Sequence, residues 1–173
     1  MIELRKYSHD DLTSIRQTLI DIQKEVHAAS MDDPFRQRFW WFVDHWGDNV
    51  DFSCFVAYDG DEAIGFSYGA PSEPGREWWR RHWSPDTPDT STFAVSELMV
   101  RAKWRKTGTG ERLHDALLTD RPEAFAVLTV NTGAPRLQAL YQSWGYERVG
   151  EHHAFADSPL YAVMVKHLHP AQP

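Results

Sequence analysis

The chain has 173 residues, of which 42% are hydrophobic and 25% are charged, and its formal net charge is −7. This length predicts a single domain over residues 1–173 with a core large enough to fold without disulfides. The acidic balance argues against general nucleic-acid binding, which needs clustered Lys and Arg. The single cysteine, Cys54, fits a cytoplasmic protein, and no apolar run has the length of a signal peptide or a membrane span.

The first third of the chain predicts one strand and two helices. Residues 2–7 alternate in polarity and are expected to form a strand. Ser8 is the expected N-cap of the first helix, with Asp11 as its capping-box partner. Residues 34–47 predict a second helix, capped by Asp33. The first helix carries one apolar stripe at 3/4 spacing, formed by Leu12, Ile15, Leu19, Ile22 and Val26.

The middle of the chain predicts a hairpin followed by a long loop. Residues 52–58 and 64–68 are strand candidates on either side of a turn signal at 59–61. Residues 71–91 are rich in Pro, Ser, Asp and Thr and predict a loop with a short helix near 77–83. A loop of this length in a compact domain is commonly a lid or a binding loop.

The second half predicts alternating strands and helices. Strands are expected at 93–100, 124–130, 146–153 and 160–167, and helices at 108–119 and 135–144. The helix over 108–119 is expected to turn Leu113, Ala116 and Leu117 inward. The β-α-β unit within this half implies a right-handed parallel crossover, whereas the hairpin before it implies antiparallel pairing. The sequence therefore predicts an α/β fold, with a mixed sheet of about seven strands and helices on both faces.

A glycine-containing loop follows the predicted strand 93–100 and leads into a helix. It reads Arg105-Lys106-Thr107-Gly108-Thr109-Gly110, called the glycine loop below. Free N–H groups at a helix start attract an anion, and glycine lets the backbone approach that anion closely. The triphosphate P-loop needs Gly-Lys-Ser/Thr, but Gly110 is followed by Glu111. The dinucleotide fingerprint needs a third glycine where Leu113 stands. The glycine loop therefore predicts a phosphate cradle of another class.

The glycine loop resembles the acyl-CoA signature of the GNAT superfamily of N-acetyltransferases, [Gln/Arg]-x-x-Gly-x-[Gly/Ala], through Arg105, Gly108 and Gly110. Residues 139–146 resemble that family's Leu-Tyr-x-x-x-Gly-[Phe/Tyr] helix and turn, with Tyr141 as its tyrosine. The order of the predicted elements is also the order of the family. The resemblance therefore covers nearly the whole chain.

The sequence departs from the family pattern at two positions. Ala102 stands where the family often has proline, and Ala134 stands where asparagine is frequent. The second departure removes one expected side-chain contact near the cofactor. Asn131, three residues earlier, is the candidate replacement.

The resemblance implies a GNAT fold in which the parallel fourth and fifth strands splay apart around the pantetheine arm. It implies acetyl-CoA, or another short acyl-CoA, as co-substrate, and no metal is expected because the histidines lack a recognisable ligand spacing. The cofactor-binding residues that it predicts are Leu98, Met99, Val100, Arg105, Lys106, Thr107, Gly108, Thr109, Gly110, Asn131 and Tyr141.

The resemblance also implies direct transfer of the acetyl group to a primary amine in a ternary complex. Tyr141 matches the family tyrosine that protonates the departing CoA sulfur, and Glu97 is the candidate base, acting through water. The alternatives are an aromatic core residue at 141 and a solvent-facing or salt-bridged glutamate at 97. The predicted acceptor is a small-molecule or peptide amine. Trp40, Trp41 and Trp79 are expected to line its pocket, with core packing or a homodimer surface as the alternatives.

Several other interpretations stay open at the level of sequence. A non-catalytic acyl-CoA-binding regulator, or a module that sequesters a ligand, would carry the same fold. Cys54 is a possible nucleophile, but a cysteine within an apolar strand is more often a small buried hydrophobe. The acidic composition and abundant tryptophan favour a cationic or aromatic amine as the acceptor.

Overall fold

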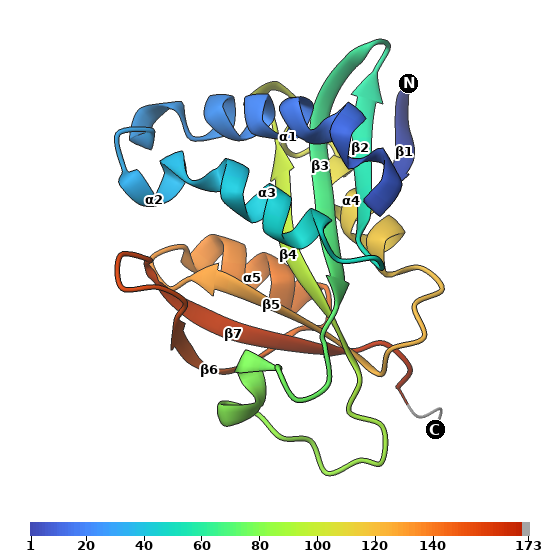
Figure 1. Ribbon diagram of the computed structural model, residues 1–173, viewed down its shortest axis with the longest axis vertical. Helices are drawn as coiled ribbons and strands as arrows, with labels where there is room; N and C mark the ends of the chain where they lie inside the picture. Colours follow the sequence, from blue (N-terminus) through green and yellow to red (C-terminus); the bar gives the residue numbers. More distant parts are fainter. Residues whose placement is uncertain (171–173) are drawn as a thin grey trace. The chain divides into compact units, whose positions relative to one another are not determined.

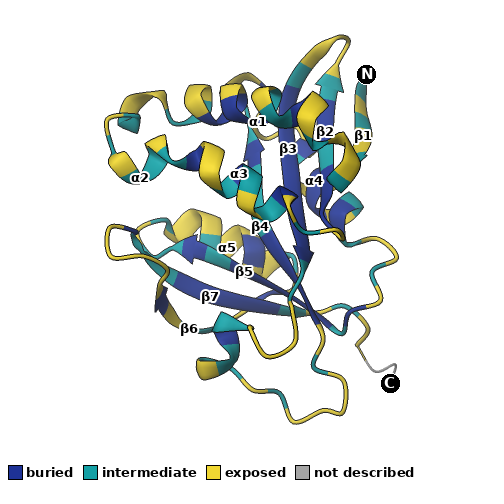
Figure 2. Cartoon of the chain, in the orientation of Figure 1, coloured by how far each residue is buried: buried dark blue, intermediate teal, exposed yellow. Residues whose placement is uncertain are grey.

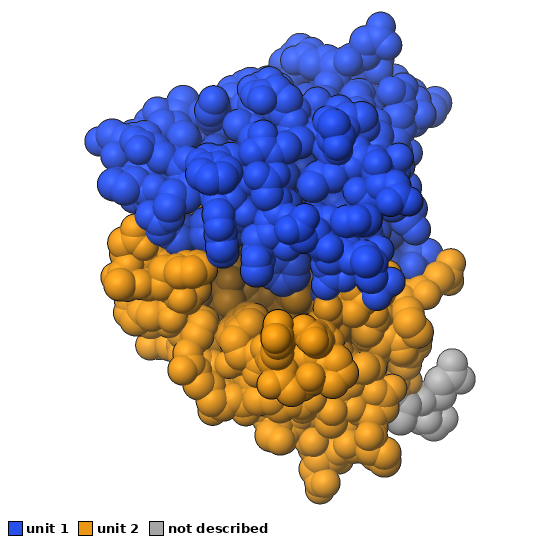
Figure 3. Space-filling model, in the orientation of Figure 1, with its two compact units in different colours: residues 1–70, 95–119 blue, residues 71–94, 120–173 orange. Residues whose placement is uncertain are grey.

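The computed structural model describes residues 1–170 (Figure 1). These residues form two compact units, coloured separately in Figure 3. Unit 1 contains Met1–Ala70 and Val95–Thr119, and unit 2 contains Pro71–Ala94 and the described residues from Asp120 onward, so each unit is built from two separate stretches of chain. A single domain over the whole chain stays a prediction. No helix within the described residues combines the length and the apolar character that crossing a membrane requires.

Seven strands and five α-helices account for the predicted order of elements. The strands are β1 (Ile2–Ser8), β2 (Ser53–Asp59), β3 (Glu62–Pro71), β4 (Thr92–Val100), β5 (Phe125–Asn131), β6 (Glu147–His153) and β7 (Leu160–His167). The α-helices are α1 (Leu12–Val26), α2 (Pro34–Gln37), α3 (Phe39–Gly47), α4 (Thr109–Leu118) and α5 (Pro135–Ser143). Short 3-10 helices are η1 (His9–Asp11), η2 (Ala28–Ser30), η3 (Trp78–Arg81) and η4 (Ala102–Trp104).

The strands pair in the order β1-β2-β3-β4-β5-β7-β6, which confirms the mixed seven-stranded sheet. The pairings β1–β2, β2–β3, β5–β7 and β6–β7 are antiparallel. The β4–β5 pairing is parallel, with Thr92–Ala94 beside Phe125–Val127. The sequence therefore predicted the fold class correctly, including the crossover that makes β4 and β5 parallel.

The predicted caps form, but the second helix is interrupted. The Ser8 amide donates to Asp11 Oδ2 at 2.8 Å, but this capping box begins the 3-10 helix η1, which leads into α1, and not α1 itself. The Phe35 amide donates to Asp33 Oδ1 at 2.9 Å at the start of α2. The predicted helix over 34–47 divides into α2 and α3 at Arg38. There the backbone tightens into 3-10 spacing, with Arg38 N–H bonded to the Phe35 carbonyl and Trp41 N–H bonded to the Arg38 carbonyl.

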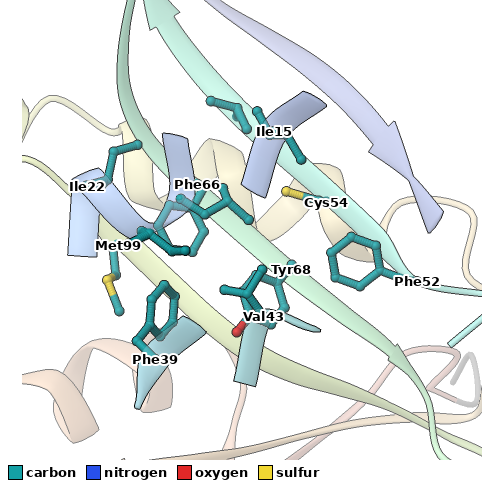
Figure 4. Close-up of a cluster of buried hydrophobic side chains, with 12 residues drawn as sticks. Ile15, Ile22, Phe39, Val43, Phe52, Cys54, Phe66, Tyr68 and Met99 are labelled. Carbon is teal, nitrogen blue, oxygen red and sulfur yellow. The ribbon is translucent and has the colours of Figure 1, made fainter. Parts of the chain in front are cut away.

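Unit 1 buries apolar side chains on both faces of its strands. On one face, α1 and α3 cover β2, β3 and β4 with a buried cluster, called the α1/α3 cluster below (Figure 4). This cluster contains Leu19, Val43, Phe66, Tyr68 and Met99. On the other face, Leu113 of α4 packs with Ala57, Ile64 and Trp104. The alternation of side chains along β2 and β3 supplies both clusters, so these strands are buried along most of their length (Figure 2).

The inward face of α4 differs in part from the sequence prediction. Leu113 and Leu117 are buried as expected, but Ala116 is only half-buried. His114 is fully buried in its place. Ala116 and His114 lie on opposite flanks of the Leu113–Leu117 stripe, and the helix is rotated so that the His114 flank faces inward.

Unit 2 has its own aromatic core. Trp83 of the long loop contacts Phe125 of β5 with ring centroids 4.7 Å apart, and Trp79 of η3 packs on Trp83 at 5.4 Å. Trp78 of η3 also stacks on His152 of β6, with centroids 4.7 Å apart. The predicted short helix in residues 71–91 is therefore present as a 3-10 helix, and these ring contacts hold it against the strands of unit 2.

Gly65 permits the close approach of β3 to β4 at the end of β4. A Cβ atom at Gly65 would lie 2.6 Å from the Met99 carbonyl oxygen, a separation that real Cβ atoms essentially never show. The obstructing atom belongs to the backbone, so no side-chain rotation relieves the clash. This glycine therefore sets the position of Met99 and Val100, the residues that lead toward the glycine loop.

We predict that Gly65→Ala destabilises the fold, by about 3 kcal/mol, because β3 and β4 must move apart. Urea denaturation followed by circular dichroism measures this change. Gly110→Ala is the matched control, because its Cβ would meet only Val100 Cγ2 at 3.9 Å. Its stability should stay within about 1 kcal/mol of the parent. Equal stability of the two variants would contradict the close-approach argument.

Candidate functional site

The glycine loop joins η4 to α4 and is anchored at both ends. Before it, the buried Trp104 donates from Nε1 to Asp59 Oδ2 at 2.9 Å. After it, the side chains of Thr109 and Leu113 are buried in unit 1. Residues 105–108 between these anchors are exposed. The loop therefore presents its backbone to solvent from a fixed base.

Two residues of the loop adopt left-handed backbone conformations. Gly108, the residue before α4, has φ of 82°, and Lys106 has φ of 62°. A Cβ built on Gly108 meets nothing within 4 Å, so this side of the loop is open. Left-handed residues alternating with others turn successive N–H groups toward a common point, which is the geometry of an anion-binding nest.

The backbone N–H groups of residues 106–110 donate no hydrogen bond to any protein group in the described part of the chain. They include the first N–H groups of α4, where the helix dipole favours negative charge. The loop is held instead by its side chains, since Thr107 Oγ1 donates to the Trp104 carbonyl at 2.6 Å and lies 2.7 Å from Thr109 Oγ1. The backbone N–H groups of residues 106–110 therefore stay available to donate to a phosphate oxygen.

The cations around the glycine loop differ in how far protein groups neutralise them. Arg101 forms an ion pair with Glu25. Arg105 donates from Nε to the Val100 carbonyl at 3.2 Å, which leaves its charge uncompensated. Neither Arg105 nor Lys106 forms an ion pair with a described residue. The loop thus keeps a local positive charge within an acidic chain.

The predicted cofactor residues of β4 lead directly into this loop. Met99 is buried in the α1/α3 cluster, and the half-buried Leu98 and Val100 pack on the α4 side. The structure brings these three residues together with the glycine loop, all within unit 1. Their backbone contacts to an acyl-CoA stay a prediction.

Glu97 lies on the same face of β4 as Met99, beside the α1/α3 cluster. It is half-buried, and this burial raises the pKa of its carboxyl to about 7, against an opposing effect of Arg36. A carboxyl that titrates near neutral pH has the protonation behaviour expected of a general base. Glu97 forms no ion pair with any described residue, which argues against the alternative of a salt-bridged glutamate.

Sequence reasoning missed two neighbours of Glu97. Arg36 of α2 is the nearby cation, and nothing in the aromatic-rich pattern of residues 34–47 indicated its position. The second neighbour is Tyr68 of β3, which is fully buried. Burial is the main cause that raises the pKa of its hydroxyl, and the charge of Glu97 raises this pKa further. Alternation along β3 could have placed Tyr68 on this face, whereas the position of Arg36 depends on the break between α2 and α3.

Tyr141 and Asn131 lie in unit 2. Tyr141 of α5 is buried, and its ring contacts Trp144 and Tyr146 edge-on at 5.3 and 5.6 Å. The aromatic packing that the sequence offered as an alternative is therefore real, and it orients the ring. Asn131 ends β5, and its Oδ1 accepts a hydrogen bond from the Gly133 amide at 2.8 Å. Its NH₂ group donates no hydrogen bond to a described residue and is a candidate to stand in for the asparagine that the family often has at position 134.

The three tryptophans predicted for the acceptor pocket lie in different surroundings. Trp40 is 49% exposed and lines a cavity of unit 1. Trp41 is 40% exposed and stacks on His45 with centroids 4.8 Å apart. Trp79 is fully buried with Arg80 over its ring at 4.2 Å, so it is a core residue of unit 2 and not the pocket residue that the sequence predicts. An indole fills core volume as readily as a pocket wall, and spacing does not distinguish the two.

Cys54 and His152 also have defined positions. Cys54 is fully buried in the α1/α3 cluster, and burial raises its thiol pKa well above the ordinary range, which disfavours a thiolate nucleophile. His152 lies under Trp78, and its Nδ1 is 2.6 Å from Arg81 Nη2. Burial is the largest cause that lowers the pKa of His152, and the charges of Arg81, His82 and His153 lower it further.

Comparison with known proteins agrees with this geometry. Residues 86–167 match a family model described as an acetyltransferase (GNAT) domain. No curated protein sequence matches the chain. A GNAT-family acetyltransferase from Staphylococcus aureus is similar in structure, with a TM-score of 0.69, 13% identity, and 98% and 100% of the two chains covered.

Arabidopsis thaliana NAA60 is a second structural relative. Its complex with acetyl-CoA has a TM-score of 0.66 and 17% identity, and covers 96% of this chain and 98% of its own. Its complex with a bisubstrate analogue has the same score and identity. Identities this low establish the fold alone. The fold is therefore shared along nearly the whole chain, and the match to the GNAT domain model covers residues 86–167.

Proposed function

We propose that this protein is an acyl-CoA-dependent N-acetyltransferase that transfers an acetyl group from acetyl-CoA to a primary amine. The observation that carries the proposal is the row of backbone N–H groups at residues 106–110, which have no hydrogen-bond acceptor among the described residues and include the left-handed Gly108. Arg105 and Lys106 add uncompensated positive charge beside them. These residues suit the pyrophosphate of a CoA ester, and the relative crystallised with acetyl-CoA supports the choice.

The co-substrate supplies the acetyl group as a thioester. The acceptor nitrogen forms a bond to the carbonyl carbon while the carbon–sulfur bond breaks. In this proposal Glu97 accepts a proton from the acceptor ammonium through a water molecule, and the Tyr141 hydroxyl donates a proton to the departing sulfur. A carboxyl with a pKa of about 7 is divided between its two forms at neutral pH, so it can accept that proton without binding it irreversibly.

We also propose roles for the remaining site residues. Leu98, Met99, Val100, Asn131 and Tyr141 would contact the pantetheine arm and thioester, and Trp40 and Trp41 would lie on the acceptor side. The acceptor is the primary amine of a small molecule or peptide. A cytoplasmic location and a homodimer stay predictions. A non-catalytic acyl-CoA-binding module is the competing proposal, and the turnover assays below distinguish it.

We predict that saturating acetyl-CoA raises the melting temperature and that Gly108→Trp abolishes this shift, because the indole would fill the cradle. Differential scanning fluorimetry measures both. Gly60→Trp is the matched control, since Gly60 also has a positive φ of 62° and open space around its Cβ position. That variant should keep the full shift. Absence of a shift in the parent protein would refute the cofactor assignment.

Tyr141→Phe should slow release of CoA thiol by about 100-fold or more, because the sulfur loses its proton donor, while acetyl-CoA binding stays near normal. A thiol-trapping assay with an accepted amine measures the rate. Tyr146→Phe is the matched control, because Tyr146 packs on Tyr141 at 5.6 Å and the family pattern accepts phenylalanine there. Unchanged turnover in Tyr141→Phe would remove this tyrosine from the mechanism. Acetyl-CoA binding by the parent without turnover on any amine would favour the non-catalytic module.

Glu97→Gln should change both stability and activity with pH. The folded-state pKa of about 7 lies above the ordinary 4.5, so charging Glu97 costs stability as pH rises from about 4.5 to 7. The variant should therefore be more stable than the parent at pH 8, by on the order of 3 kcal/mol, and equal to it at pH 4. The parent's turnover should rise near pH 7 as Glu97 loses its proton, and the variant should lack this rise. Chemical denaturation at both pH values and a pH–rate profile check this, and a stability difference independent of pH would contradict it.

A further inference from the structure

Unit 1 contains a cavity of about 290 Å³ between α1 and the segment of residues 31–40, called the α1–α2 cavity below. This volume is at the lower end of small-ligand pockets. Its charged lining residues are Arg16, Lys24 and Arg36, and no carboxylate is among the described residues that line it. The rest of its wall is apolar or uncharged, and includes Ile20, Met31 and Trp40.

The three cations of the cavity lining differ in whether a carboxylate neutralises their charge. Arg16 forms a two-bond pair with Asp44, at 2.6 and 2.9 Å, which neutralises it. Lys24 and Arg36 form no ion pair with any described residue. The α1–α2 cavity therefore keeps an excess of positive charge, in contrast to the acidic balance of the whole chain. Local charge decides which ligand a cavity accepts, whereas net charge acts mainly on solubility and long-range attraction.

Arg36 is held in place through a neutral partner. Its Nη1 donates to His27 Nδ1 at 2.8 Å. Burial, with Arg36 and Arg105 as further causes, lowers the pKa of His27 to about 4, so this imidazole is neutral at pH 7 and leaves the guanidinium charge intact. The buried Gln23 donates from Nε2 to the Arg36 carbonyl at 3.1 Å, which fixes α2 against α1. A cation positioned in this way loses little entropy when it binds an anion.

The α1–α2 cavity also adjoins the surroundings of Glu97. Arg36 lies close enough to Glu97 to oppose the rise in its pKa. Phe39 of the cavity wall belongs to the same buried cluster as Met99, two residues from Glu97 on the same face of β4. Arg36 and Phe39 therefore link the lining of the cavity to the surroundings of the candidate base.

We infer that the α1–α2 cavity binds the carboxylate of the acceptor, and that the acceptor class is an amino acid with a free carboxylate and an apolar side chain. Arg36 provides the planar fork that pairs with a carboxylate through two hydrogen bonds. Ile20, Met31 and Trp40 provide apolar surface for the side chain. A peptide N-terminus is a poorer fit, because its nearest carbonyl is neutral. The identity of this ligand as the acceptor rests on the proposed function, whereas carboxylate binding in the cavity does not.

Isothermal titration calorimetry on the full chain without acetyl-CoA tests carboxylate binding directly. The probes are 3-phenylpropionate and 3-phenylpropionamide, which share size and ring and differ in charge. We expect the parent to bind the acid about tenfold or more tighter than the amide, and Arg36→Gln to lose this preference. Arg36→Lys should retain part of it. Arg38→Gln, which removes a neighbouring cation outside the cavity lining, should retain all of it. Equal binding of the two probes by the parent, or equal losses in the Arg36 and Arg38 variants, would overturn the inference.

Turnover of L-phenylalanine against L-phenylalaninamide tests the acceptor class. The parent should favour the acid in kcat/KM, although the amine of the amide is the easier one to deprotonate. Arg36→Gln should reverse that preference, and any effect of Arg36 on Glu97 cancels in the ratio of the two substrates. A raised KM for acetyl-CoA with an unchanged ratio would assign Arg36 to the cofactor and refute the inference. Carboxylate binding without any thermal shift by acetyl-CoA would refute the proposed function and leave the cavity assignment standing.

Discussion

The candidate site depends on one feature, the run of backbone N–H groups at residues 106–110 that donate to no group within residues 1–170. Such groups cost free energy when nothing binds them, and here their position is fixed from several directions. Trp104 is bonded to Asp59 on one side, and Thr109 and Leu113 are buried on the other. Gly65 lets β3 meet β4 just before the loop. The surrounding fold thus holds a set of donors whose natural ligand is an anion.

Burial of Glu97 is the second constraint. The cluster that gives α1 and α3 their place on the sheet also desolvates this carboxyl, so stability of unit 1 and the protonation of Glu97 are linked. Arg36 of α2 opposes this effect, because its positive charge lowers the pKa of Glu97. The same arginine lines the α1–α2 cavity. One side chain therefore connects the candidate base to the cavity inferred to hold the acceptor's carboxylate, and both belong to unit 1.

Much of the fold followed from residue patterns, and the exceptions have local causes. The strands, the hairpin at residues 59–61 and the parallel β4–β5 pairing were predictable because alternation, turn chemistry and crossover rules are short-range signals. The glycine loop was predictable because left-handed positions favour glycine. Periodicity missed the break at Arg38, since it depends on two 3-10 hydrogen bonds and not on any helix-breaking residue. It also missed the burial of His114, which reflects the rotation of α4.

The candidate site was less predictable than the fold for the same reason. Leu98, Met99 and Val100 lie near the glycine loop because they precede it closely in the chain, so their neighbourhood was predictable, and their contacts to a cofactor stay a prediction. The environment of Glu97 depends on residues far away in sequence, namely Arg36 and Tyr68. Trp79 shows the limit of composition, because a tryptophan in a long loop turned out to be a buried core residue. Contacts between distant segments decide such cases, and no spacing rule encodes them.

Calorimetric titration of the parent protein with acetyl-CoA, NAD⁺ and ATP in parallel tests the central claim most directly. The geometry of the glycine loop predicts one acetyl-CoA bound per chain, with NAD⁺ and ATP binding at least about tenfold more weakly, because the loop lacks both the third glycine and the Lys-Ser/Thr pair. Binding of ATP or NAD⁺ in preference to acetyl-CoA, or no binding of acetyl-CoA at all, would contradict it.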